Sequence, residues 1–160
     1  MAVDMFLKID AVTGESSDSK HKGEIDVLSW SWGMTQSASM HTATGGGSGK
    51  ADVHDVSITK YIDSATPAIM QHCCSGKHFQ NAKLTVRKAG GNPVEYMVLE
   101  MKDVIISSLS SGAGSGDDRV TEHLTLNFAS YKMTYTPQDD KGAAKAAIPQ
   151  SFDIRQNVVQ

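Results

Sequence analysis

Three acidic residues, Asp117, Asp118 and Glu122, are the strongest candidates for acid–base chemistry in the chain. Paired carboxylates can cleave glycosidic bonds, one acting as general acid and the other as base or nucleophile. These three flank Arg119 at the start of a predicted strand, a setting that favours a solvent-exposed ion-pair cluster. A glycan-active enzyme using Asp117 and Glu122 is therefore an alternative that we do not favour, and no catalytic residue is predicted.

Histidine and cysteine come closest to a metal-binding pattern at His72, Cys73, Cys74 and His78. Consecutive residues on a helix point about 100° apart, so the first three cannot converge on one ion. Neighbouring cysteines also rarely reach disulfide geometry. The pattern indicates a helix end with buried, reduced thiols, and neither a metal nor another cofactor is predicted.

The glycine-rich run Gly45-Gly46-Gly47-Ser48-Gly49-Lys50 invites comparison with a phosphate-binding loop. That motif requires Gly, four residues and then Gly-Lys-Ser/Thr, followed by a helix. Here Thr44 stands at the first position and Ala51 at the last, and a strand pattern follows. The run therefore predicts a glycine loop without a nucleotide site.

Composition narrows the class of protein further. The chain has 160 residues, 39% of them hydrophobic, and a net charge of −3, without a basic stripe to neutralise phosphates. Nucleic acid is therefore not an expected partner, and no apolar run approaches the roughly 20 residues of a membrane-spanning helix. The first ten residues lack the pattern of a signal peptide, so we expect synthesis in the cytoplasm and, if the protein is exported, a route that accepts folded chains.

The segment from Glu24 to Met34 alternates like a strand, but the alternation changes phase in its middle. Ile25 and Val27 share one face, whereas beyond them the apolar residues occupy even positions. Because successive side chains of a strand point to opposite faces, a bulge or bend is predicted here. One face of the second half then carries the predicted core anchors Trp30 and Trp32, and the other carries small neutral residues, Ser29, Ser31 and Thr35.

A second phase change follows Phe128. Leu126 and Phe128 alternate on even positions and are predicted core residues, whereas Tyr131, Met133 and Tyr135 continue on odd ones. Other strands are expected over residues 3–9, 52–62, 82–88, 94–109 and 152–158, with an exposed loop over 13–23. One helix is predicted over 64–76, with Ser64 as its cap, Pro67 in its first turn and Gly76 at its end.

These elements predict a single mainly β domain over residues 1–160. About seven strands, two of them long and changing phase, favour a bent antiparallel β-barrel or two packed sheets with one short α-helix.

The whole chain resembles the haemolysin-coregulated protein (Hcp) family of bacterial type VI secretion systems. The matching segments are Gly23-Glu24-Ile25-Asp26-Val27-Leu28-Ser29-Trp30-Ser31-Trp32-Gly33, Thr59-Lys60-Tyr61-Ile62-Asp63, Ser75-Gly76-Lys77, Ala82-Lys83-Leu84-Thr85-Val86-Arg87-Lys88, Asp117-Asp118-Arg119-Val120-Thr121-Glu122 and the strand from Leu124 to Phe128.

The resemblance implies homohexameric rings that stack into the tube expelled by a contractile sheath, under a VgrG spike. It also implies that rings are released from the cell and can shelter effector proteins in the lumen, without membrane insertion. In such a ring we expect Ser29, Ser31 and Thr35 to face the lumen and cargo. The loop from Gly45 to Lys50, through Gly46, Gly47, Ser48 and Gly49, is expected to reach an adjacent subunit or ring.

A monomeric ligand-binding β-barrel is the main alternative. Such a protein needs an enclosed apolar cavity, and the aromatic content of 6% is low for lining one. The size of the particle in solution separates the two hypotheses.

Overall fold

Antiparallel strands and one helix make up the parts of the chain that the structure describes, which are residues 2–41 and 49–160. The structure is a computed structural model, and it confirms the mainly β class. In chain order the elements are β1 (Val3–Ile9), β2 (Ile25–Asp26), β3 (Ser29–Ser31), β4 (Met34–Gln36), β5 (Ala51–Val53), β6 (Val56–Tyr61), α1 (Thr66–Ser75), β7 (Phe79–Lys88), β8 (Glu95–Gly112), β9 (Thr121–Tyr135), β10 (Ile148–Asp153) and β11 (Val158–Val159).

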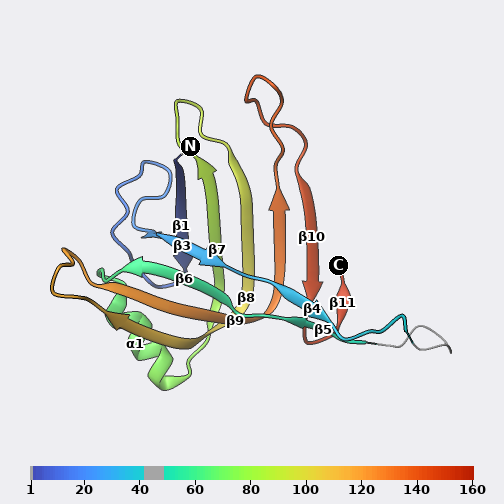
Figure 1. The fold of residues 1–160 in the computed structure, drawn as a ribbon, viewed down its shortest axis with the longest axis horizontal. Helices are drawn as coiled ribbons and strands as arrows, with labels where there is room; N and C mark the ends of the chain where they lie inside the picture. The colour runs from blue at the N-terminus through green and yellow to red at the C-terminus, as the bar shows by residue number, and fades with distance from the viewer. Residues whose placement is uncertain (1, 42–48) are drawn as a thin grey trace.

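Strands β8 and β9 form a long hairpin that belongs to two sheets at once (Figure 1). The outer edge of β9 pairs with β6 over residues 121–126 and with β10 over residues 130–135. All of these strands belong to one nine-stranded sheet, which bends into two parts. The part that we call the upper sheet runs from β11 through β10, β9, β8, β7 and β1 to β2, and the part that we call the lower sheet continues from the hairpin through β6 to β3. The upper sheet stands upright in Figure 1, with the lower sheet folded across its foot.

The two sheets meet at a corner. There, the alternation between inward and outward side chains shifts by one residue in both β8 and β9. On β8, Asp103 adopts a left-handed conformation with φ 53°, and Met101 before it and Val104 after it are both fully buried. On β9, Phe128 and Tyr131 are likewise three residues apart and both buried. The irregular sites face each other across the hairpin. The predicted phase change near Phe128 is confirmed, and it marks the bend.

The tryptophan segment passes from one sheet to the other at a single peptide bond. The N–H of Val27 donates to the carbonyl of Met5 on β1 at 3.0 Å, and the N–H of Leu28 donates to the carbonyl of Thr59 on β6 at 2.8 Å. The predicted bend lies here, but the segment splits into β2, β3 and β4 instead of forming one long strand. Strands β2 and β3 do not pair with each other, so the sheet stays open and no closed barrel forms.

The core fills the concave side of the bend. Of the predicted core anchors, Leu126 and Phe128 lie within it, whereas Trp30 and Trp32 are half-buried and pack against its margin. Both sheets and the helix supply the fully buried apolar side chains, which include Leu7, Ile9, Ile25, Ile58, Ile69, Leu84, Leu99, Met101, Leu124 and Leu126.

A polar contact explains why Trp32 lies at the edge of the core. Its indole N–H donates to the carbonyl of His54 at 2.9 Å, and its ring packs edge-on against Tyr131 with the centroids 4.8 Å apart. An indole that is buried needs a partner for its N–H. The strand margin offers a free carbonyl for this purpose, which the centre of the core does not.

Helix α1 packs beside the lower sheet and follows the predicted signals at both ends. Pro67 lies in its first turn, and Gly76 ends it in a left-handed conformation with φ 66°. The predicted cap is wrong, because the Ser64 hydroxyl donates to the carbonyl of Thr13 at 3.3 Å. The carboxylate of Asp63 instead accepts the backbone N–H two residues further on, at 3.0 Å.

Candidate functional site

The acidic residues singled out for chemistry are separated by the fold. Asp117 accepts the backbone N–H of Gly114 within the β8–β9 turn. The guanidinium of Arg119 stacks over the ring of Tyr61, 4.0 Å from its centroid. Glu122 is buried beneath the lower sheet with 1% of its surface exposed. The predicted solvent-exposed cluster is therefore wrong for Glu122.

Glu122 forms a buried ion pair with Lys60. The Lys60 Nζ lies 2.6 Å from Glu122 Oε2 and also donates to Asp63 Oδ1 at 2.8 Å, and Lys60 itself is 0% exposed. The Thr66 hydroxyl donates to the same oxygen of Glu122 at 2.9 Å. Strand β6, strand β9 and the first turn of α1 are thereby joined through one ammonium group. Throughout the described residues, every buried side-chain polar atom has a hydrogen-bond partner.

Strand parity could have revealed this ion pair in the sequence. Lys60 has the parity of the inward residues Val56 and Ile58, and Glu122 has that of Leu124. Two opposite charges on the core faces of two strands indicate a buried pair. The proximity of Glu122 to Arg119 in the sequence obscured it.

The histidine and cysteine group does not assemble. His72 stacks on Phe79 with the ring centroids 4.1 Å apart, and its Nδ1 contacts the carbonyl of Ala68 at 2.8 Å. Cys73 is half-buried and Cys74 is exposed, which corrects the expectation of two buried thiols. Among the residues that the structure describes, no three His, Cys, Asp or Glu side chains are placed to hold a metal ion.

Small hydroxyl side chains cover the convex face of the lower sheet. Cross-strand register places Ser29 opposite Thr59 and Ser31 opposite Ser57, and the same two rows continue onto β9 and β8. We call this surface the hydroxyl face; its members are Ser29, Ser31, Ser57, Thr59, Ser108, Ser110, His123 and Thr125. Thr35 is exposed but lies apart from this face, on β4.

Hydrogen bonds between neighbouring side chains hold the hydroxyl face together. The Thr125 hydroxyl lies 2.6 Å from the hydroxyls of both Ser107 and Ser108, at the bulge of β8. The Thr59 hydroxyl lies 3.0 Å from Nδ1 of His123. Its members are short hydroxyl side chains and His123, so this face presents a polar surface to solvent, with the carboxylate of Asp55 at its border accepting from the Ser107 hydroxyl at 2.6 Å.

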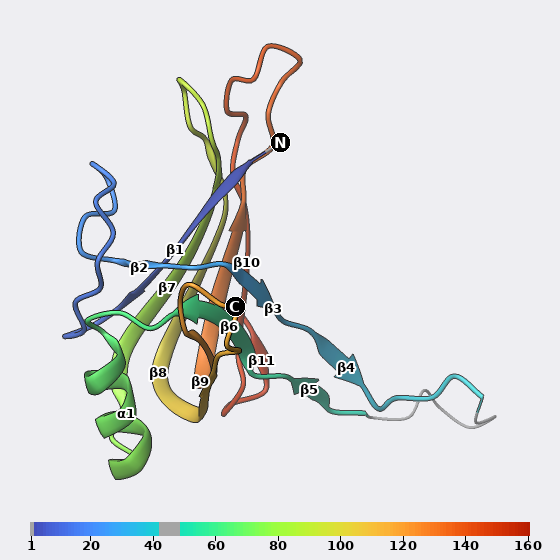
Figure 2. The ribbon, with the colours of Figure 1, turned by 60° about the vertical axis from the view of Figure 1, so that its left-hand side comes forward.

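Strands β4 and β5 form a separate ribbon that projects away from both sheets (Figure 2). The backbone of Lys50 exchanges two hydrogen bonds with the Ser37 hydroxyl across the ribbon, at 3.1 and 3.4 Å. Gly49 passes so close to the backbone of Ala38 that an added Cβ would clash with it. The predicted loop residues Gly45, Gly46, Gly47 and Ser48 lie outside the described residues.

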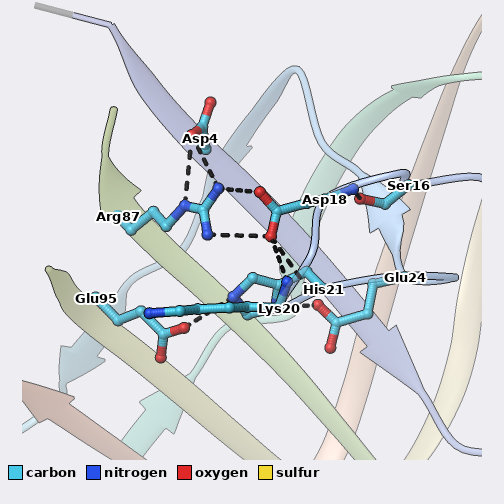
Figure 3. A network of polar contacts seen from close by, with 8 residues as sticks. All are labelled: Asp4, Ser16, Asp18, Lys20, His21, Glu24, Arg87 and Glu95. Atoms are coloured by element: carbon cyan, nitrogen blue, oxygen red, sulfur yellow. Dashed lines mark hydrogen bonds and ion pairs between the residues drawn. The ribbon is translucent and has the colours of Figure 1, made fainter. Parts of the chain in front are cut away.

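The segment 13–23, expected to be an exposed loop, is partly buried and tied to the upper sheet by charged side chains (Figure 3). His21 is 5% exposed, stacks on Phe6, and its ring nitrogens face the carboxylates of Glu24 and Glu95, the latter at 2.8 Å. Both ring nitrogens can donate at once only when the imidazole is protonated.

A second group of ion pairs, around Arg87, ties the same loop to the upper sheet beside His21. Arg87 forms ion pairs with Asp18 of the loop and, at 3.3 Å, with Asp4 of β1. Hydrogen bonds from the Arg87 guanidinium, aided by the backbone N–H of Lys20, lower the pKa of Asp18 to about 2. Sequence reasoning missed these contacts because their partners lie 69 and 83 residues apart.

Removing one member of the Lys60–Glu122 pair is expected to destabilise the protein strongly. Glu122→Gln should lower the free energy of unfolding by about 3 kcal/mol, because the fully buried ammonium loses its nearer carboxylate and keeps Asp63 alone. The double variant K60M/E122L should recover most of that loss. Urea unfolding of K60M, E122L and K60M/E122L measures the coupling between the two side chains, and additive effects would contradict it.

Acid should weaken the ion pair between Asp18 and Arg87 over a defined pH range. The pKa of Asp18 is lowered in the folded chain, so its contribution is complete above the ordinary value of 3.8 and disappears as the pH falls toward about 2. The stability difference between the wild type and Asp18→Asn should therefore shrink between about pH 5 and about pH 2. Urea midpoints of both proteins across this range test this expectation, which a constant difference would refute.

Comparisons with known proteins agree on one family. The family model described as "Type VI secretion system effector, Hcp" matches residues 6–135. The Pseudomonas aeruginosa protein named hcp1 is 56% identical over 160 residues, which are 99% of each chain. A solved structure described as a type six secretion system protein superposes with a TM-score of 0.94 at 30% identity, covering 99% of this chain and all of that one. Hcp1 from Salmonella typhimurium superposes with a TM-score of 0.80 at 35% identity over the full length of both chains.

No helix within the described ranges is both long enough and apolar enough to cross a membrane.

Proposed function

The chain belongs to the Hcp family and is a tube protein of type VI secretion, and we propose that its copies close into hexameric rings whose lumen carries effector proteins. The stacked rings would form the inner tube within a contractile sheath, beneath a VgrG spike. After synthesis in the cytoplasm, rings would leave the cell through this machine, into the medium or a target cell.

The hydroxyl face is the observation that carries this proposal. It spans β3, β6, β9 and β8 and offers short, neutral side chains instead of charges or large apolar groups. Such a surface can hydrogen-bond to a passing protein without burying apolar area, so it holds cargo weakly and releases it. We propose that Ser29 and Ser31 face the lumen, joined by the rest of the hydroxyl face, and that Thr35 lies near the lumen on β4.

The β4–β5 ribbon supports assembly. A two-stranded ribbon alone is marginally stable in water, and this one meets the core through the β5 side chains Ala51 and Val53. Met34 is 47% exposed on it, and Ala51 and Val53 are half-buried. We propose that the ribbon, with the adjoining loop from Gly45 to Lys50, packs on an adjacent subunit or ring.

Copies that use two different faces to contact each other form a closed ring when the rotation between them closes. The ribbon and the surface that receives it would be two such faces. A monomeric ligand-binding barrel leaves the ribbon without a partner and elutes near 17.1 kDa, whereas six copies elute near about 103 kDa.

Labelling tests which side of the ring the hydroxyl face occupies. In a C73A/C74A background, Ser31→Cys labelled with maleimide gold should place the gold inside the ring in electron micrographs. Gln71→Cys, on the exposed side of α1, serves as the matched control and should place gold outside the lumen. Rings with gold only on the outer rim for Ser31→Cys would overturn the lumen assignment.

A methyl group at Gly49 should separate assembly from folding. Gly49→Ala forces the backbone of Ala38 to move and should disrupt the ribbon, which lies outside the core. We expect loss of rings by size-exclusion chromatography and electron microscopy, with little change in Tm. Gly91→Ala is the control, since its Cβ would meet nothing within 4 Å. An unchanged ring population in Gly49→Ala would refute a role for the ribbon.

A further inference from the structure

Four charged residues form a row across the convex face of the upper sheet. Lys8 of β1 lies opposite Lys83 of β7, Lys83 opposite Glu100 of β8, and Glu100 opposite Lys132 of β9. The other face of the same strands belongs to the core, where Leu7, Leu84 and Leu99 are 0% exposed. We call these four residues the lysine row. They line a hollow of about 470 Å³ together with other residues that include Asp10, Lys102 and Gln160.

The four lysines of this surface have no carboxylate partner in the described part of the chain. Lys60, Arg87 and Arg155 all form ion pairs with N–O distances within 4.0 Å, whereas Lys8, Lys83, Lys102 and Lys132 do not. Like charges directly opposite each other on paired strands are destabilising. The Lys8–Lys83 pair is therefore unfavourable in the isolated chain, although Glu100 opposite Lys83 on β8 offsets it in part, and an external group of negative charge would relieve it further.

We propose that the lysine row is a docking surface for an acidic helix of a partner protein, with acidic side chains at positions i, i+3 and i+10 and a basic one at i+7. The match is one of spacing. Neighbouring strands lie about 4.8 Å apart, so the row presents charges plus, plus, minus and plus over about 14 Å. Helix positions i, i+3, i+7 and i+10 share one face and lie at about 0, 4.5, 10.5 and 15 Å along the axis.

The composition of the hollow favours a protein over a nucleic acid. Glu100 sits within the row and would repel a phosphate backbone, whose charge does not change sign along its length. The surface has neither an arginine for bidentate phosphate binding nor an exposed aromatic ring for base stacking. A helix that carries charges of both signs can pair with the lysines and with Glu100 at once. The proposal goes beyond tube assembly, because it requires only that this face be accessible on the assembled protein.

The test uses the full chain and two labelled helical peptides of about 20 residues. The matched peptide carries Glu at i, i+3 and i+10 and Lys at i+7, and the control peptide exchanges the residues at i+3 and i+7. Fluorescence anisotropy should show the matched peptide binding about tenfold more tightly than the control, with the difference falling at high salt. Equal affinities would overturn the proposal.

Variants of the protein locate the binding. K83E/K132E, and the milder K83Q/K132Q, should lose the matched peptide while keeping wild-type circular dichroism and elution volume. K22E/K77E makes the same change of charge at two exposed lysines elsewhere and should bind as the wild type does. Equal loss in K22E/K77E, or tighter binding of a DNA duplex or phosphatidylserine vesicles than of the matched peptide, would contradict the proposal. A shift in the elution volume of K83Q/K132Q alone would instead assign the surface to a second copy of this chain.

Discussion

The bend of the β8–β9 hairpin is the constraint on which the rest of the structure depends. Two sheets share these strands, so the apolar side chains before and after the corner must all reach one concave side. Regular alternation cannot achieve this around a sharp turn. The left-handed Asp103 on β8 and the matching irregularity between Phe128 and Tyr131 on β9 shift the alternation by one step in both strands. The core stays continuous, and two convex faces of different character are left to solvent.

Those two convex faces have different chemistry. The hydroxyl face on the lower sheet is neutral and made of short side chains, whereas the lysine row on the upper sheet is charged and carries long ones. Neighbouring residues of β6 in the lower sheet also differ in where their side chains lie. The ammonium of Lys60 is buried with Glu122 because its parity in β6 points it inward, while Thr59 beside it joins the hydroxyl face.

Much of this fold could be predicted from local pattern, and the failures have a physical cause in common. Alternation located most strands, both phase changes and the serine side of β3, and the helix signals at Pro67 and Gly76 hold. The strands predicted over 52–62 and 152–158 are wrong as single strands, because the chain breaks between β5 and β6 and turns between β10 and β11. Contacts between distant segments were missed. Arg87 meets Asp18, and Lys60 meets Glu122, only because register brings separate strands together. Trp30 and Trp32 were placed deeper than they lie, since hydrophobicity alone does not show where a sheet ends. The role of the hydroxyl face toward cargo and the role of the ribbon in assembly remain predictions.

The exchange of partners between Val27 and Leu28 has a consequence for cooperativity. The backbone N–H groups of these two consecutive residues are anchored to β1 in the upper sheet and to β6 in the lower one, and no linker between them can absorb a relative movement of the two sheets. Neither sheet can therefore open while the other stays intact at this point. The two amides should exchange their protons with solvent at nearly the same slow rate, as members of a single unfolding unit.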